Sequence, residues 1–252
     1  MEVTRYLVIA LVLAGGGALQ SAAGFGYALL SVTLLLVIGL EPYEAIPIVS
    51  MATTIQSATG VWHHRRDVPW RLVASSTLLV LLTIPVGVFL LSRVTLLDDS
   101  QVKQVFGAVL IVVVLAFAGW RIQPRKSVPA GWTATAMLSA GLLGGLCGMS
   151  GPPIVLWAIS HEGWSSQRIR CTLWAIFLLK TPLVIVFLYH RFGIVVLESA
   201  LLAIAMAPAV LLGTIPGIWI GNRIPKRWLR RIAFTLLVLV GCYMLLQPLV
   251  MK

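Results

Sequence analysis

The amino-acid sequence predicts an all-α, polytopic membrane protein, and three observations support this fold class. Hydrophobic residues make up 59% of the 252 residues and charged residues only 11%, whereas soluble domains carry about 25% charged residues. The apolar residues form blocks of roughly 20 residues, the length that a helix needs to cross a bilayer. Basic residues lie between these blocks, a pattern typical of the cytoplasmic loops of membrane proteins.

Neither the net charge nor the cysteine content indicates another class of protein. A net charge of +11 would suggest nucleic-acid binding in a soluble protein, but here it follows from the basic loops, and no nucleic-acid partner is expected. Cys147, Cys171 and Cys242 stand singly in apolar segments, so no disulfide framework, metal site or cofactor is predicted. Residues 1–24 are interpreted as retained rather than cleaved, because a similar glycine-interrupted stretch recurs near residue 145.

The first half begins with a broken pair of shorter apolar segments. These are predicted as helices over residues 6–22 and 27–40, joined at "GFG" (24–26). Glycine at the junction permits backbone conformations that end a helix. Full-length spans are then expected at residues 44–62, 71–92 and 103–121.

The second half follows the same order of elements. Its broken pair is predicted over residues 132–147 and 153–160, joined at "GMSGPP" (148–153), and full-length spans follow at 168–190, 195–220 and 229–250. The sequence therefore predicts roughly eight to ten helical segments. Each broken pair is a re-entrant hairpin or two short spans, and the brevity of residues 153–160 favours the hairpin.

The two halves resemble each other, which predicts two membrane repeats at residues 1–123 and 124–252. Matched positions include Gly24 with Gly148, Gln56 with Lys180, and Gly87 with Gly217. Loop 93–103 has balanced charge, whereas its counterpart 223–231 is strongly basic. Because basic loops stay in the cytoplasm, these equivalent loops are expected on opposite sides of the membrane. Inverted repeats of this kind are a transporter signature.

The breaks in the apolar segments predict a binding site. Irregular backbone at membrane depth persists only when it is buried in protein or lines a watery cavity. Pro152 suits the start of a new helix, whose amide groups and positive dipole end would attract an anion. The alternative is that the small residues only allow close helix packing. The candidate site residues at the two breaks are Gly24, Phe25, Gly26, Gly148, Ser150, Gly151 and Pro152.

Lys180 lies alone within an apolar stretch, ten residues from Arg170 and ten from His190. At about 15 Å from either end, its side chain cannot reach an interface. None of the eight acidic residues lies in the middle of a predicted span, so an anionic ligand is the expected partner. A neutral structural lysine or a misplaced span are the alternatives. Gln56, Thr53 and Trp174 are further candidates for lining the site.

Several of these sequence features together resemble those of a known family. The glycine-rich first break, "HHRRDVPWR" (63–71), "GLCGMSGPPIV" (145–155) and "FLLKTPLVIV" (177–186) together are similar to the sulfite exporter TauE/SafE family, in the 4-toluene sulfonate uptake permease group. The resemblance implies transport of a small anion such as a sulfonate, sulfoacetate, sulfite or similar carboxylate across the bacterial inner membrane.

The preferred functional hypothesis is a secondary anion transporter that works by alternating access around a midplane site. An anion channel or a non-transporting membrane subunit is the alternative. An enzyme is not expected, because the sequence has no metal-ligand motif such as HExxH and no nucleophile paired with a base. The specific anion, the direction, the coupling ion and the oligomeric state, with a homodimer among the options, stay open.

Overall fold

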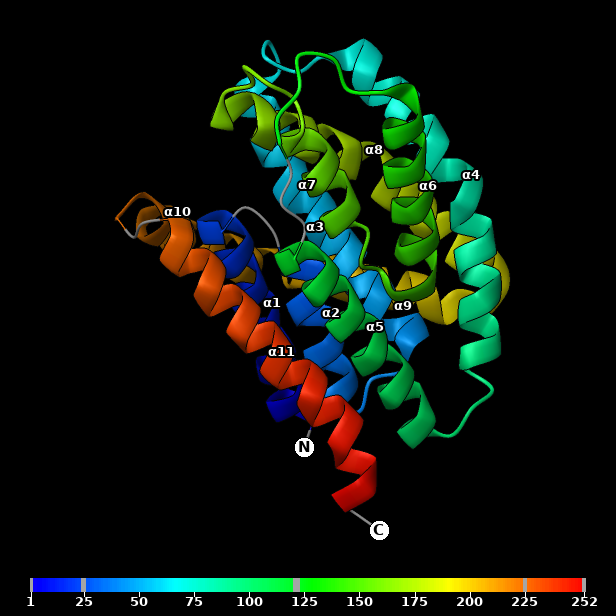
Figure 1. The fold of residues 1–252 in the computed structure, drawn as a ribbon. Coiled ribbons are helices and arrows are strands. Elements are labelled where there is room, and N and C mark those ends of the chain that lie inside the picture. The colour runs from blue at the N-terminus through cyan, green and yellow to red at the C-terminus, as the bar shows by residue number, and fades with distance from the viewer. Residues whose placement is uncertain (1, 24–25, 120–122, 224–225, 251–252) are drawn as a thin grey trace.

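The computed structural model describes residues 2–23, 26–119, 123–223 and 226–250. Within these segments the chain forms eleven α-helices and no β-strand (Figure 1). The helices are α1 (Glu2–Ala23), α2 (Tyr27–Val37), α3 (Pro42–His64), α4 (Trp70–Val94), α5 (Asp99–Gly119), α6 (Ala130–Cys147), α7 (Gly151–Ile159), α8 (Ser166–Phe192), α9 (Ile194–Ala205), α10 (Ala207–Arg223) and α11 (Lys226–Val250). The all-α prediction is confirmed.

The turn between α2 and α3 shows how the sequence sets helix boundaries. Gly39 has a φ of 86°, and the Leu40 amide donates back to the Leu35 carbonyl at 3.0 Å, which closes α2. Glu41 then caps α3 in a capping box with Glu44, whose carboxylate accepts from the Glu41 amide at 2.9 Å. The reversal therefore needs only four residues between two helices.

Both predicted broken pairs are present, but their first members are longer than short re-entrant pieces. The candidate span in α1 covers 20 residues and that in α6 covers 18, about 30 and 27 Å of helix. Each matches the hydrocarbon thickness of a bilayer of about 30 Å. By contrast, α2 has 11 residues and α7 has 9, so neither crosses a bilayer alone.

The span predicted over residues 195–220 is two helices, which raises the count above the predicted eight to ten. Helices α9 and α10 meet at Met206 with a bend of 54°. Pro208 lies one residue into α10 and has no amide hydrogen to donate to the preceding turn. The ring also crowds the carbonyl four residues earlier, so the helix breaks there.

Five described helices are long and apolar enough to cross a membrane, namely α1, α4, α5, α6 and α8, and the bent α9–α10 pair makes a sixth span. Helix α3, predicted as a full span at 44–62, is not among them. Its buried side chains include Ser50, Thr53, Gln56 and Ser57, which lower its apolar character. Helix α3 therefore carries several buried polar side chains inside an apolar bundle.

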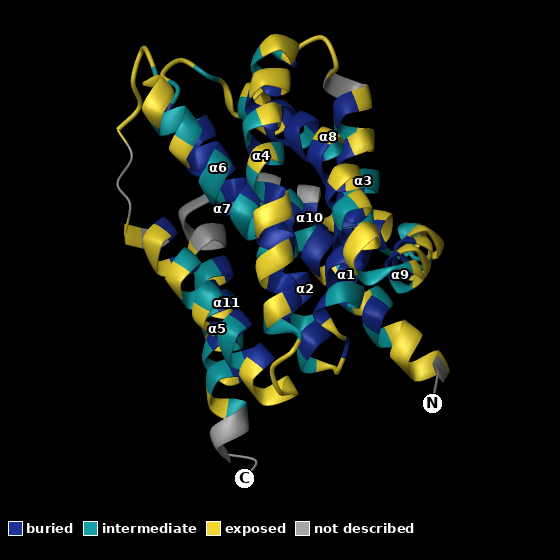
Figure 2. Cartoon of the chain, turned by 90° about the vertical axis from the view of Figure 1, so that its right-hand side faces the viewer, coloured by how far each residue is buried: buried dark blue, intermediate teal, exposed yellow. Residues whose placement is uncertain are grey.

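The packing surrounds a central pair of helices. Helix α3 crosses α8, while α4 packs on α6, α1 on α10, and α5 on α11. Figure 2 shows exposed residues along the outer helix faces and buried residues between them. Large apolar side chains such as Leu82, Phe89, Leu212 and Trp219 are exposed on α4 and α10. These faces suit contact with lipid.

Glycines permit the closest helix contacts. In the α4–α6 pair, Gly145 faces the backbone of Ile84 and Val88, and Gly141 faces the Val80 carbonyl and Thr83 hydroxyl. In the α1–α10 pair, Gly213 and Gly217 face the carbonyls of Ala14 and Ala18. Small residues four apart let helix backbones approach in membranes. The packing interpretation of "GLLGG" (141–145) therefore holds, alongside the break that follows it.

Gly145→Ala should destabilise the protein. The added methyl would lie 2.8 Å from the Val88 amide nitrogen and overlap the Ile84 carbonyl, and overpacking costs about 1–3 kcal/mol. Thermal melting of detergent-solubilised protein should show a lower Tm.

The matched control is Gly131→Ala in the first turn of α6, where an added methyl meets nothing within 4 Å. Its Tm should equal or slightly exceed that of the unmodified protein, because alanine favours helix more than glycine. Equal melting of both variants with the unmodified protein would contradict the close α4–α6 contact.

Candidate functional site

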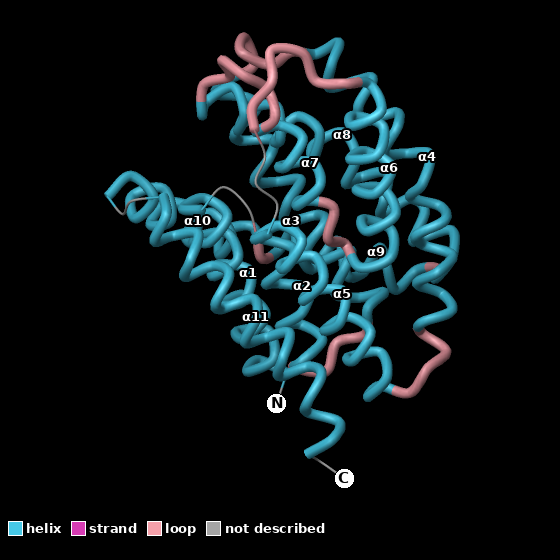
Figure 3. The backbone as a smooth tube through the Cα atoms, viewed as in Figure 1, coloured by secondary structure: helices cyan, strands magenta, loops and turns pink. Residues whose placement is uncertain are grey.

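The break between α6 and α7 is a compact backbone reversal. Gly148 ends α6 with a φ of 72° and donates to the Gly144 carbonyl at 3.1 Å, and the Met149 amide donates to the Leu143 carbonyl at 3.2 Å. Helix α7 begins at Gly151, after Ser150. Figure 3 shows this loop in the middle of the bundle, while most other loops gather at its two ends.

The first break differs in what its second helix offers. Gly26 precedes α2 with a φ of 101°, and the amides of Tyr27, Ala28 and Leu29 lie in the first turn, where helices leave amide hydrogens free. In the first turn of α7, two of the corresponding positions are Pro152 and Pro153, which have no amide hydrogen to offer. The two helix starts are therefore unequal, and α2 is the better donor. Gly24 and Phe25, predicted for the site, lie outside the described residues.

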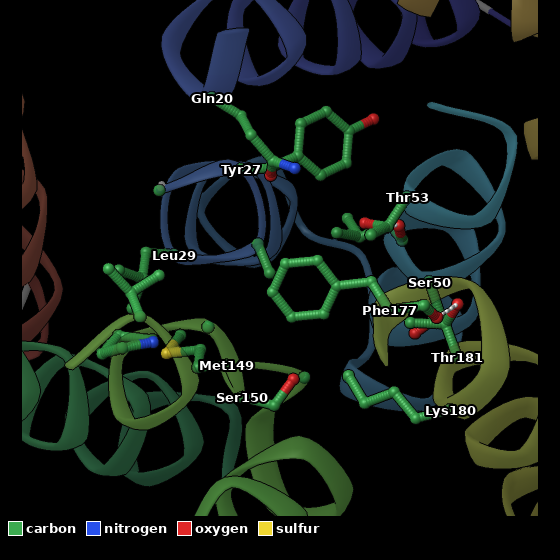
Figure 4. A pocket seen from close by; sticks show the side chains of 17 residues that line it. Gln20, Tyr27, Leu29, Ser50, Thr53, Met149, Ser150, Phe177, Lys180 and Thr181 are labelled. Atoms are coloured by element: carbon green, nitrogen blue, oxygen red, sulfur yellow. Dashed lines mark hydrogen bonds between the residues drawn. The ribbon is translucent and has the colours of Figure 1, made fainter. Parts of the chain in front are cut away.

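The two breaks border one cavity of about 40 Å³ (Figure 4). Its walls come from the end of α1 and from α2, α3, α7 and α8. The lining residues are Gln20, Gly26, Tyr27, Ala28, Leu29, Val49, Ser50, Thr53, Gly148, Met149, Ser150, Gly151, Pro152, Val155, Phe177, Lys180 and Thr181. The structure thus brings together most of the residues that the sequence singled out.

Lys180 lines this cavity with a side chain that is only 3% exposed. Its ammonium lies 5.5 Å from the centre of the Phe177 ring, a cation–π distance. A Cβ built on Gly144 would lie 3.8 Å from Nζ, so the absence of a side chain there leaves room for the ammonium. Among the described residues no carboxylate forms a salt bridge with Lys180, so a positive charge on this amine would have no anionic side chain to compensate it.

The hydroxyl groups around the cavity divide into donors and acceptors. Thr53 donates to the Val49 carbonyl at 2.7 Å, and Thr181 donates to the Phe177 carbonyl at 2.7 Å. Because each hydroxyl has one hydrogen, Thr53 presents an acceptor to the cavity, whereas the Thr181 oxygen is also hydrogen-bonded to the Thr54 hydroxyl at 2.6 Å. Groups that line the cavity and carry hydrogens to offer an anion include the Lys180 amine, the Ser150 hydroxyl, the Gln20 amide and the first turn of α2.

Two predicted site residues lie elsewhere. Gln56 does not line the cavity; its amide contacts Ser21 at 3.1 Å and Thr214 at 3.2 Å. Trp174 packs against Gly60, where its ring fills the space of a side chain. Gln56 on α3 thus faces α1 and α10, and Trp174 on α8 faces α3. A helix presents interior side chains to different neighbours, and spacing along the sequence does not distinguish them.

The structure adds lining residues that the sequence analysis did not propose. Gln20 and Tyr27 flank the first break, and Phe177 precedes Lys180 by three residues, which places both on one helix face. Figure 4 shows the Phe177 ring in the middle of the view, with Gln20 and Tyr27 above it and Ser150 and Lys180 below. The three-residue spacing of Phe177 and Lys180 is the feature of the sequence from which Phe177 could have been predicted to line the site.

Comparison with known proteins identifies the family. The family described as "Sulfite exporter TauE/SafE" matches residues 8–244, which is nearly the whole chain. The protein belongs to the TauE/SafE family. A relative in Cupriavidus necator, named "Probable sulfite/organosulfonate exporter TauE", is 26% identical over 242 residues, covering 93% of this chain and 91% of the relative. No solved structure matches the chain.

Membership of the TauE/SafE family establishes the general class. Members are membrane transporters and not enzymes, and the chain is accordingly a multi-pass membrane transporter. The resemblance drawn from the sequence motifs is therefore confirmed. The name of the Cupriavidus necator relative refers to sulfite and organosulfonates, which are anions.

Gly148→Ala should destabilise the break more than Gly39→Ala does. Both glycines have a left-handed φ, which costs an alanine about 1–2 kcal/mol. At Gly148 the methyl would also press against Ile46 at 3.3 Å and Val32 at 3.4 Å, whereas Gly39 has nothing within 4 Å. Thermal melting should give the order unmodified protein, Gly39→Ala, Gly148→Ala. A Gly148→Ala variant as stable as Gly39→Ala would contradict the packed geometry of the break.

Proposed function

We propose that this protein exports a small sulfur oxyanion, with sulfite as the simplest case, across the bacterial inner membrane. The observation that carries the proposal is the Lys180 ammonium, which is buried in a mid-bundle cavity without a carboxylate partner among the described residues. A midplane charge costs several kcal/mol unless a partner or water compensates it. A bound anion provides that partner, and the relative's name supplies the sulfur chemistry.

The size of the cavity favours a compact anion. Its volume of about 40 Å³ corresponds to about three or four water-sized spheres, and sulfite has four heavy atoms. The Ser150 hydroxyl, the Gln20 amide and the α2 amides supply hydrogen-bond donors beside the ammonium. A larger organosulfonate would require movement of the Phe177 ring, which stands between these groups.

Helix packing supports two related halves. The contact of α1 with α10 has its counterpart in that of α6 with α4, and α3–α9 has its counterpart in α8–α4. At residue level, Gly17 lies beside the Val210 carbonyl and the Thr214 hydroxyl, as Gly141 lies beside those of Val80 and Thr83. These correspondences follow the offset of the predicted repeats at residues 1–123 and 124–252.

Inverted halves around one site suit alternating access. In this proposal the two halves rock about the crossing of α3 and α8, and each break in turn closes the cavity from one side. An inside-negative potential favours the outward movement of each negative charge by about 2.3 kcal/mol per 100 mV. Export of an anion can therefore proceed down the membrane potential, without a carboxylate proton relay.

Lys180→Met should weaken anion binding without unfolding the protein. Purified protein should gain thermal stability with sulfite, as any ligand of the native state stabilises it. Loss of the ammonium should weaken binding at least about tenfold, because a hydrogen bond to a charged group contributes about 1.5–3 kcal/mol. The basal Tm should hold or rise, since a buried unpaired charge is removed.

Two variants control this measurement. Lys180→Arg should keep part of the sulfite response, because it keeps the charge, and Lys126→Met, at an exposed linker position, should keep all of it. Sulfite efflux from cells or proteoliposomes should follow the same order. An unchanged sulfite response in Lys180→Met would remove Lys180 from the site.

Single cysteines test the inversion of the halves. In a background without Cys147, Cys171 and Cys242, Asp98→Cys in the α4–α5 loop and Arg223→Cys at the end of α10 lie in loops 93–103 and 223–231, which the predicted repeats match. A membrane-impermeant maleimide should label the first from outside the cell and the second only after permeabilisation. Labelling of both from the same side would contradict the inverted arrangement.

A further inference from the structure

Gln56 forms the centre of a polar cluster separate from the anion cavity. Its amide nitrogen lies 3.1 Å from the Ser21 hydroxyl, 3.2 Å from the Thr214 hydroxyl and 3.5 Å from the Gly17 carbonyl. The side chain of Gln56 is only 4% exposed. Helices α1 and α10 therefore direct three oxygen atoms to the amide nitrogen of Gln56 on α3.

This cluster contains more acceptors than donors. The Thr214 hydroxyl already donates to the Val210 carbonyl at 2.8 Å, and its single hydrogen is thereby used. The Gln56 amide and the Ser21 hydroxyl together have three hydrogens for the four oxygens of Gly17, Ser21, Thr214 and Gln56, and the Gln56 Oε1 is buried without a hydrogen-bond partner in the described part of the chain. A buried acceptor without a donor is costly, and a cation satisfies several such oxygens at once.

The position of the cluster in the fold also favours a cation. Gly17 and Ser21 lie in the last two turns of α1, just before the first break. The carbonyl end of a helix carries partial negative charge. Helices that end within the membrane coordinate cations in this way in several transporters.

The other half of the molecule already has a cation at the corresponding place. Lys180, which the proposed repeats match with Gln56, holds its ammonium beside Gly144 in the last turn of α6. The carbonyl end of α6 thus faces a tethered positive charge. The carbonyl end of α1 faces the neutral amide of Gln56 and a set of oxygens. Lys180 thus supplies a fixed positive charge, whereas the oxygens around Gln56 leave a place for a mobile cation.

We propose that Gln56, Ser21, Thr214 and the Gly17 carbonyl form a binding site for a monovalent alkali cation, with sodium as the ion to test. Rotation of the Gln56 amide by half a turn exchanges Nε2 for Oε1, which then lies 3.1 to 3.5 Å from the other three oxygens, so that one ion among the four can contact all of them. All four ligands are neutral, which suits a single charge, since divalent ions are held in proteins largely by carboxylates. In the described segments no group of three or more His, Cys, Asp or Glu side chains gathers at any point.

The experiment measures the Tm of the full-length protein in sodium chloride and in choline chloride at equal ionic strength, without any sulfite or other test anion. Choline is too large for a site between packed helices, so it controls for salt. Sodium should raise the Tm in a saturable manner, by about 2–4 °C or more. No difference between sodium and choline would overturn the proposal. Because no transported anion is present, this result does not depend on the proposed export function.

Gln56→Lys gives the decisive comparison, because it copies the arrangement of the other half. A tethered ammonium should replace the bound ion, so the Tm in choline should rise towards the value in sodium, and added sodium should have no further effect. A sodium response that persists undiminished in Gln56→Lys would overturn the assignment. A purely structural glutamine would not produce this pattern of rescue.

A second variant serves if Gln56→Lys does not fold. Thr214→Val removes one ligand oxygen at nearly constant volume and should reduce the sodium response several-fold. The matched control is Thr135→Val, at an exposed position of α6 whose hydroxyl bonds only to the Gly131 carbonyl, and it should keep the full response. Equal sodium responses in Thr214→Val and Thr135→Val would also overturn the site.

Discussion

The buried ammonium of Lys180 is the constraint around which the rest of the molecule is arranged. It lies in a bilayer-sized bundle whose described part offers it no carboxylate, only the face of the Phe177 ring and the carbonyl end of α6. Those contacts only partly compensate a charge taken out of water. Gly144 leaves room for Nζ, and hydrogen-bond donors from the two helix breaks border the same cavity. This arrangement fits the proposed binding of a negatively charged solute.

The hydrogen bonding of the backbone explains why two helix breaks are stable inside an apolar bundle. At Gly148 the reversal is closed by amide-to-carbonyl hydrogen bonds within the turn itself, so few polar groups are left for lipid to face. The remaining free amides at the start of α2 border the cavity. The use of proline at the start of α7 removes amides where none are needed. Function and stability thus draw on the same few residues.

The structure contains two polar centres, one at Lys180 on α8 and one at Gln56 on α3. The Lys180 centre is the proposed anion site, and the Gln56 centre is rich in oxygen acceptors. If the proposed repeats hold, the two centres occupy matching positions, which gives a physical basis for coupling one solute to another. Helix contacts through Gly141, Gly145, Gly213 and Gly217 hold both centres in rigid pairs of helices.

The sequence by itself determined the all-α membrane class, both helix breaks, the isolation of Lys180 and the TauE/SafE resemblance, because apolar length, glycine and proline positions and charge are local properties. Only the tertiary structure decided that α9 and α10 separate beside Pro208, that α3 buries several polar side chains, and that Gln56 turns towards α1 and α10 rather than into the Lys180 cavity. Those outcomes depend on which helices pack together, and the pattern of one helix does not record the face that its neighbours will cover.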